Sequence, residues 1–242
     1  THLYASAGAL MVDVRWLPVP NCKPGPTQPI KYIILHYTEY GTDEETIAHF
    51  SDPARESSSH YLICYNGEIV QFVREADTAW HAGKSAWQDD VNLNPCSIGI
   101  EISNGGEPNG CPPYAAVQYN ALGHLLTALL KRHDLKPEAV LGHSDIAPDR
   151  KIDPGKHFNW RWLEQHGLAA PYVPPTGLKS TTPPLEILAK LGYRATPTDA
   201  GVPPASPEAI VAAFQRRYFP EAPVLGKLCP RTEYFIRQGK RK

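Results

Sequence analysis

Two histidines and an aspartate have the residue types that catalytic metal sites use. His36 lies in the apolar run KYIILHYT, His143 ends the segment AVLGH, and Asp153 lies in the loop RKIDPG. Catalytic zinc commonly takes three protein ligands, from neutral histidine and carboxylate, and keeps a fourth position open for water. These three residues could supply such a set, so the pattern predicts a zinc site.

Each of the three residues also has an ordinary structural explanation. A histidine in an apolar run is more often a hydrogen-bonded core residue than a metal ligand. An aspartate before Pro-Gly is more often a turn residue. The prediction of a metal site therefore depends on the combination of the three residues with a fourth, Glu101.

Glu101 and Lys151 would add the groups that amide hydrolysis needs beside a metal ion. Glu101 lies on the polar side of the alternating segment SIGIEIS, and a carboxylate held near a metal-bound water can act as its base. Lys151 precedes Asp153 by two residues, where its charge could stabilise the oxyanion of a tetrahedral intermediate. A glutamate on a surface strand and a solvated lysine in a loop are the alternative explanations.

His60 and the cysteines suggest other chemistries that the sequence does not support. His60 follows the serines of SSSHYL, but neither an acidic partner nor a G-x-S-x-G segment accompanies it. We therefore expect His60 to pack near the start of a strand. The five cysteines contain no C-x-x-C pair, which argues against a thiolate zinc site, and we assign no role to Cys96 or Cys111.

Several of the candidate residues lie in segments with strand patterns. KYIILHYT has the β-branched and aromatic composition of a buried strand. SIGIEIS alternates, which places Ile98, Ile100 and Ile102 on one face and Glu101 on the other. HYLICYNGEIVQFV predicts two strands joined at Asn66-Gly67, a strong hairpin signal, and AVLGH predicts a further short strand.

Helix patterns interleave with these strands. Thr42 and Glu45 have the spacing of a capping box at the start of a helix, and residues 115–133 predict a long amphipathic helix. Alternation of strands and helices is typical of layered folds in which helices cover a sheet. The sequence therefore predicts an α/β fold with a central mixed β-sheet flanked by helices.

Proline-rich sequence divides the chain. The stretch PYVPPTGLKSTTPP at residues 171–184 has five prolines in fourteen residues and no apolar periodicity, which is typical of an extended spacer. The segments LEILAKLGY, PEAIVAAFQRRYF and PRTEYFIRQ follow it and predict three short helices. We expect a catalytic domain at residues 1–170, a linker at 171–184 and a small all-α three-helix domain at 185–242.

Composition excludes several other classes of protein. The chain has 24 basic and 25 acidic residues without a long block of one charge, which argues against a nucleic-acid partner. It contains no apolar run long enough for a transmembrane segment. Residues 1–10 precede Met11 and have no signal-peptide pattern, so either a signal peptide has been removed or these ten residues are foreign to the protein.

Five motifs occur in an order that identifies a family resemblance. KYIILHYT, SSSHYLICYNGEIVQFV, TAWHAGKSAW, NPCSIGIEISN and LGHSDIAPDRKIDPG span about residues 30–160 and together resemble the zinc-dependent N-acetylmuramoyl-L-alanine amidases of the type 2 amidase domain. The resemblance implies the fold of type 2 amidases and peptidoglycan-recognition proteins. It also implies Zn²⁺ held by His36, His143 and Asp153, with Glu101 and Lys151 as catalytic residues.

The resemblance also suggests substrate contacts. Trp80 and His81 belong to the AWHAG motif that lines the cleft in the family, and we expect His81 either to contact substrate or to have only a packing role. From their positions in the sequence alone, we expect Trp87 and Asn104 to border the sugar or peptide subsite. The C-terminal segments LAKLGY and AAFQRRYF resemble peptidoglycan-binding three-helix modules, although PEAPVLGKLCPRT replaces the usual D-G-x-x-G-x-x-T stretch.

Together these features predict hydrolysis of the amide between N-acetylmuramic acid, or its 1,6-anhydro form, and L-alanine of peptidoglycan stem peptides. The role would be cell-wall turnover or recycling, with peptidoglycan or muropeptides as partners. A peptidoglycan-recognition protein without activity and a zinc hydrolase of another amide are the alternatives. We expect a monomer in the periplasm or cell envelope, with the cytoplasm as the alternative compartment.

Overall fold

One six-stranded mixed sheet forms the centre of the computed structural model, which describes residues 13–25, 28–194 and 197–240. The strand order is β1-β5-β4-β9-β3-β10, and every neighbouring pair is parallel except β4 and β5. The strands are β1 (Val14–Trp16), β3 (Tyr32–Tyr37), β4 (Tyr61–Ile63), β5 (Ile69–Gln71), β9 (Ser97–Ile102) and β10 (Val140–Gly142). The predicted mixed sheet is confirmed.

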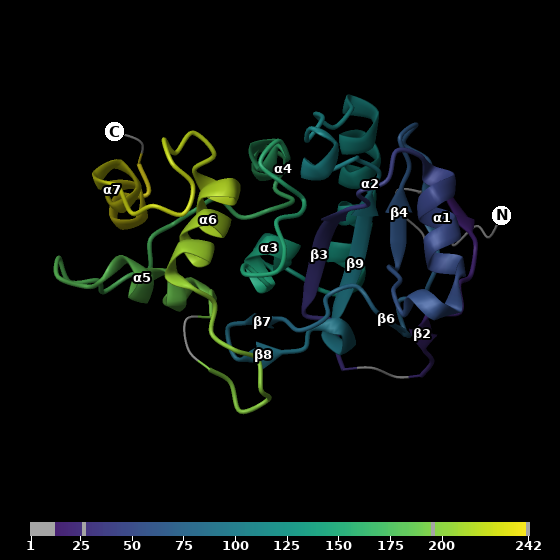
Figure 1. Cartoon of the computed structure of the whole chain (residues 1–242), viewed down its shortest axis with the longest axis horizontal. Coiled ribbons are helices and arrows are strands. Elements are labelled where there is room, and N and C mark those ends of the chain that lie inside the picture. The colour runs from purple at the N-terminus through teal and green to yellow at the C-terminus, as the bar shows by residue number, and fades with distance from the viewer. Residues whose placement is uncertain (1–12, 26–27, 195–196, 241–242) are drawn as a thin grey trace.

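Helices cover both faces of this sheet. The helices are α1 (Asp43–Ser51), α2 (Ala116–Arg132), α3 (His143–Ile146), α4 (Trp160–Gln165), α5 (Pro184–Leu191), α6 (Pro207–Tyr218) and α7 (Pro230–Gln238). α2 and α4 pack on one face, and α1 packs on the other face over β4 and β5. Figure 1 shows α1 at one end of the molecule and α5 to α7 at the other.

The central strands β3 and β9 follow the alternation that the sequence predicts. Ile33 and Leu35 join Ile98 and Ile100 in the cluster beneath α2. The register places His36 opposite Glu101 on neighbouring parallel strands, so both side chains point to the other face. One face of these strands therefore builds the core and the other carries the candidate chemistry.

Two local predictions are also confirmed. Thr42 caps α1, since its Oγ1 accepts a hydrogen bond from Glu45 N at 3.2 Å while Glu45 Oε2 accepts one from Thr42 N at 3.0 Å. β4 and β5 form the antiparallel hairpin expected from Asn66-Gly67. Gly67 has a φ of 84°, a conformation that favours glycine, and its N–H donates to Cys64 O.

Short strands at the lower edge of the sheet complete the fold. β2 (Cys22–Lys23) pairs with β6 (Thr78–Ala79), and β7 (Ala86–Trp87) pairs with β8 (Asp90–Val91). Figure 1 shows β7 and β8 below α3 and β3. Among the helices of the described residues, none is long and apolar enough to cross a membrane.

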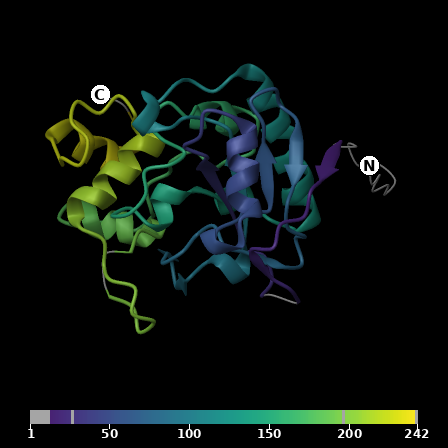
Figure 2. The same cartoon turned by 45° about the vertical axis from the view of Figure 1, so that its right-hand side comes forward.

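The three predicted C-terminal helices are present and pack against the sheet. Residues 171–183 contain neither helix nor strand. Ile187 of α5 and Phe214 of α6 share one buried cluster with Tyr32 and Ile34 of β3. Figure 2 shows these helices, in green to yellow, lying against the rest of the chain. Whether the chain divides functionally at residues 170 and 185 stays a prediction.

A buried ion pair joins α6 to the segment that carries His143. Arg217 Nη1 donates to Asp145 Oδ2 at 2.6 Å, and Arg217 Nη2 donates to Val140 O at 2.8 Å. Tyr193 OH donates to the other carboxylate oxygen of Asp145 at 2.6 Å. Both members of the ion pair are almost fully buried, so the C-terminal helices are bonded directly to β10 and α3.

Candidate metal centre

His36, His143 and Asp153 meet at one point of the structure. The Nδ1 atoms of His36 and His143 lie 2.9 Å apart, and each lies 3.0 Å from Asp153 Oδ2. All three residues are buried and form a group that could hold a metal ion. Their side chains converge although 107 positions separate His36 from His143.

The parallel sheet explains this convergence. β3 and β10 are neighbouring parallel strands with Leu35 opposite Gly142, so the residues that follow these positions reach the same edge. His36 is the next residue of β3, and His143 is the first residue of α3. Asp153 is in the loop after α3, and its carbonyl accepts a hydrogen bond from Ser144 N at 3.0 Å.

The donor set fits a cation. His143 Nε2 lies 3.2 Å from Ala82 O, and a carbonyl can only accept, so the ring proton is on Nε2 and the lone pair of Nδ1 faces the centre. Burial and the neighbouring His143 lower the pKa of His36 to about 4, which keeps its ring neutral at neutral pH. Two neutral imidazoles and a carboxylate are the ligand types of catalytic zinc sites.

Asp153 is held as a carboxylate. Burial alone would raise its pKa, but the close approach of the His143 and His36 rings to its carboxylate keeps the pKa well below its ordinary value. The negative charge is therefore present throughout the neutral pH range. A buried charge of this kind needs a positive partner, and a divalent ion would supply one.

Glu101 lies beside the triad with an unused carboxylate oxygen. Its Oε2 is buried and makes no hydrogen bond with any residue in the described part of the chain. Burial, reinforced by the charge of Asp153, holds the pKa of Glu101 well above its ordinary value, and Lys151 opposes that shift. A carboxyl group with a raised pKa next to the triad is a candidate for accepting and returning a proton during the reaction.

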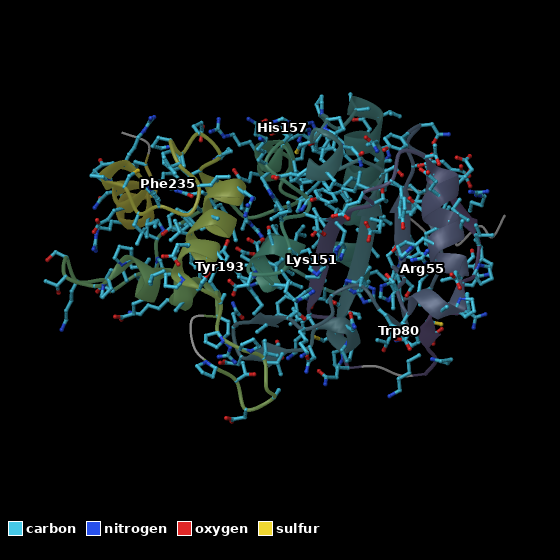
Figure 3. The ribbon with its side chains drawn as sticks, viewed as in Figure 1. Arg55, Trp80, Lys151, His157, Tyr193 and Phe235 are labelled. Atoms are coloured by element: carbon cyan, nitrogen blue, oxygen red, sulfur yellow. The ribbon has the colours of Figure 1, made fainter. Side chains whose placement is uncertain are left out.

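Lys151 enters from the loop that also carries Asp153. Its backbone N–H donates to Ala147 O at 3.0 Å, which fixes the start of that loop. The side chain is half-buried, and Figure 3 shows it between α3 and β3. Its ammonium group acts on the pKa of both His36 and Glu101, so its charge reaches the triad.

The candidate substrate residues lie in different environments. Trp80 is half-buried, and Figure 3 shows it near β6, apart from Lys151. Trp87 is buried in β7, where its ring meets that of Tyr193 edge-on at 4.9 Å. Asn104 is buried, and its amide donates to Pro112 O at 3.0 Å and accepts from Gly106 N at 2.9 Å. Substrate contacts by these residues stay predictions.

His60 and His81 are buried beneath the triad. His60 Nδ1 accepts from Gly99 N at 3.1 Å, and its Nε2 lies 3.1 Å from Asp77 O, as expected for a packing role. His81 Nδ1 lies 3.0 Å from His36 Nε2. Sequence reasoning did not find this contact, because the AWHAG motif indicates a cleft residue and gives no sign of a bond to His36.

Comparisons with known proteins agree with the geometry. A family profile described as N-acetylmuramoyl-L-alanine amidase matches residues 26–156. The N-acetylmuramoyl-L-alanine amidase AmiD of Escherichia coli is 36% identical over 218 residues, which cover 79% of this chain and 75% of the relative. The 1,6-anhydro-N-acetylmuramyl-L-alanine amidase AmpD of Haemophilus influenzae is 32% identical over 171 residues, which cover 62% of this chain and 90% of AmpD.

The structure is also similar to solved structures of amidases. E. coli AmiD in complex with the substrate anhydro-N-acetylmuramic acid-L-Ala-D-gamma-Glu-L-Lys superposes with a TM-score of 0.71 at 32% identity, covering 87% of this chain and 88% of that one. AmpDh3 from Pseudomonas aeruginosa superposes with a TM-score of 0.72 at 33% identity, covering 87% and 91%. The chain belongs to the N-acetylmuramoyl-L-alanine amidase family.

Proposed function

We propose that this protein hydrolyses the amide between N-acetylmuramic acid, or its 1,6-anhydro form, and L-alanine of a stem peptide. The observation that carries this proposal is the convergence of His36, His143 and Asp153, with Glu101 opposite His36 on the neighbouring strand. Further support comes from the relatives, since AmiD is named for this bond and its solved complex contains an anhydro-muropeptide substrate. The process would be cell-wall turnover or recycling.

We propose Zn²⁺ as the resident ion, held by His36, His143 and Asp153. When bound, zinc supplies a Lewis acid that polarises the scissile carbonyl and lowers the pKa of the attacking water. The triad offers three ligands, as catalytic zinc sites do, and the match of residue types supports this choice of metal. Both histidine ligands would bind through Nδ1.

Glu101 would move the proton in this reaction. Its carboxylate takes a proton from the attacking water and gives it to the nitrogen of L-alanine as the amide bond breaks. Its raised pKa suits both transfers, because the group must bind the proton and then release it. Lys151 would stabilise the negative charge that forms on the carbonyl oxygen.

Replacement of Glu101 tests the proposed chemistry. Glu101→Gln keeps the size of the side chain and removes the base, so turnover of an anhydro-muropeptide should fall about 100-fold or more. Mass spectrometry of the products should detect stem peptides that begin with L-alanine for the parent protein and far less of them for Glu101→Gln. Glu138→Gln is the matched control, because Glu138 is exposed next to β10, and this variant should retain full activity.

The same assay separates the proposed enzyme from a recognition protein. A recognition protein would bind the anhydro-muropeptide and release no stem peptide, and a different zinc hydrolase would leave murein uncleaved while carrying zinc. Parallel assays with anhydro and intact muramyl substrates determine which sugar is preferred. Inactivity of the zinc-loaded parent protein on both substrates would contradict the proposed function.

We further propose that the protein works as a monomer in the periplasm or cell envelope. The support is the C-terminal helical region, whose sequence resembles peptidoglycan-binding modules and which is bonded to α3. Fractionation of cells that express the protein tests the compartment, with recovery in the cytoplasm as the contrary result. Light scattering of the purified protein tests the monomeric state.

A further inference from the structure

His81 lies directly behind His36, and both of its ring nitrogens have partners. His81 Nδ1 is 3.0 Å from His36 Nε2, and His81 Nε2 is 3.2 Å from Ser97 Oγ. The side chain is only 8% exposed. His81 therefore faces the ligand histidine rather than the space in front of the triad.

The far end of this chain of contacts fixes where its protons lie. Ser97 Oγ is 2.7 Å from Leu93 O, and two oxygen atoms at that distance need a proton between them. A carbonyl has no proton to give, so the Ser97 hydroxyl donates to Leu93. Having used its one proton, Ser97 Oγ must accept from His81 Nε2.

The proton positions then follow ring by ring. A neutral imidazole has one N–H, so His81 with its proton on Nε2 has a lone pair on Nδ1. This lone pair accepts from His36 Nε2. His36 is left with its own lone pair on Nδ1, which is the atom that faces His143 and Asp153. Within the described residues no carboxylate contacts the His81 ring, and burial without a counter-charge favours the neutral form.

Ala82, the residue after His81, fixes the proton position of His143 in the same way. Ala82 O accepts from His143 Nε2 at 3.2 Å. The side chain of Asn94 holds the backbone of both residues, since its Oδ1 accepts from His81 N at 3.1 Å and from Ala82 N at 2.7 Å. Two consecutive residues therefore set the proton position of both histidines in the triad.

Strand β9 is shaped to hold His81. Ser97, Gly99 and Glu101 alternate along one face of this strand. Ser97 anchors the His81 ring, and a Cβ at Gly99 would lie 2.4 Å from His81 Cγ, so only glycine leaves room for the ring. On this one face of β9, Ser97 accepts a hydrogen bond from His81, Gly99 leaves room for its ring, and Glu101 is the proposed base.

We propose that His81 is a positioning residue that orients His36 and holds it in the tautomer that can bind a metal ion through Nδ1. Hydrogen bonds from outer residues to metal-binding histidines commonly fix the ring in this way, and their loss lowers metal affinity about 10- to 100-fold. This inference rests on the proposed metal role of His36. It assigns His81 a hydrogen bond with the metal-binding residue His36 instead of a contact with substrate.

Two variants of similar size separate orientation from packing. His81→Asn places an amide oxygen near the position of Nδ1 and can still accept from His36, whereas His81→Leu cannot. Zinc affinity is measured by competition with a chelator. We expect His81→Leu to bind zinc about 10- to 100-fold more weakly than the parent, and His81→Asn to recover most of that loss. Equal losses in the two variants, or no loss in His81→Leu, overturn the inference.

A second measurement needs no variant and does not depend on activity. Long-range ¹H–¹⁵N NMR of the metal-free, histidine-labelled parent distinguishes the two neutral tautomers of each ring. We expect His36 with its proton on Nε2, and the opposite tautomer overturns the inference. Zinc binding by the parent is measured first, because a parent that binds no zinc contradicts the proposed function, whereas a zinc-binding parent with unaffected His81→Leu contradicts only this inference.

Discussion

Arg217 of α6 forms a buried ion pair with Asp145, two residues after the proposed metal ligand His143. Asp145 Oδ2 also accepts from Gly142 N at 2.8 Å, so the same carboxylate holds the turn between β10 and α3. The guanidinium group of Arg217 lies 4.4 Å from the centre of the Trp160 ring. The C-terminal helices therefore support the backbone that presents His143.

This relationship predicts that Arg217→Met destabilises the fold. Removal of one member of a buried ion pair leaves an uncompensated charge and costs about 3–5 kcal/mol. Arg161→Met is the control, because Arg161 pairs with Glu221 at a half-exposed site and should cost about 1 kcal/mol or less. Urea unfolding of both variants checks the difference. Similar losses in the two variants would show that the C-terminal helices do not depend on the Asp145 contact.

Gly99→Ala should disturb the packing of the His81 ring against β9. The added methyl group would lie 2.4 Å from His81 Cγ, and the ring cannot move away without losing its bond to His36. We expect a loss of about 1–3 kcal/mol in unfolding free energy together with weaker zinc binding. Gly41→Ala is the control, since the nearest atom to an added Cβ there is 3.6 Å away. Unchanged zinc affinity in Gly99→Ala would contradict this account of β9.

Much of this site can be predicted from sequence patterns, but some of its contacts cannot. The alternation in SIGIEIS places Glu101 on the face opposite Ile100, and the apolar pattern around His36 predicts its strand, because both depend on the local period of a strand. The hydrogen bonds from His36 to His81 and from Arg217 to Asp145 join segments far apart in the chain. A local pattern of residues cannot predict such contacts. Trp87 shows the same limit, since its burial is set by contact with Tyr193.

Glu101 should destabilise the metal-free protein at neutral pH. Its folded-state pKa is raised above the unfolded value, so the folded state loses stability as pH rises from the unfolded pKa through the raised one. Glu101→Gln removes this charge, and metal-free Glu101→Gln should be more stable than the parent at pH 7 by on the order of 1 kcal/mol. The gain should disappear near pH 4. Thermal unfolding at the two pH values tests this, and a less stable variant at pH 7 would contradict it.

Glu75 should have the opposite pH dependence. Burial alone would raise its pKa, but hydrogen bonds from His133 and Tyr61 and the charge of Arg132 hold the pKa below its ordinary value. A lowered pKa stabilises the fold above the unfolded value of about 4.3, and that stability is lost as pH falls further. Glu75→Gln should therefore cost about 1.5–3 kcal/mol at pH 7 and progressively less below about pH 4. A pH-independent difference between the variant and the parent in urea unfolding would contradict this.

The metal content of the purified protein tests the central claim most directly. Inductively coupled plasma mass spectrometry should find about one zinc ion per chain after zinc loading and dialysis, because His36, His143 and Asp153 form one site. Asp153→Ala, which removes the carboxylate ligand, should retain less than about a tenth of that amount under the same dialysis. A parent protein without zinc, or an Asp153→Ala variant with a full equivalent, would contradict the assignment of these three residues as the metal ligands.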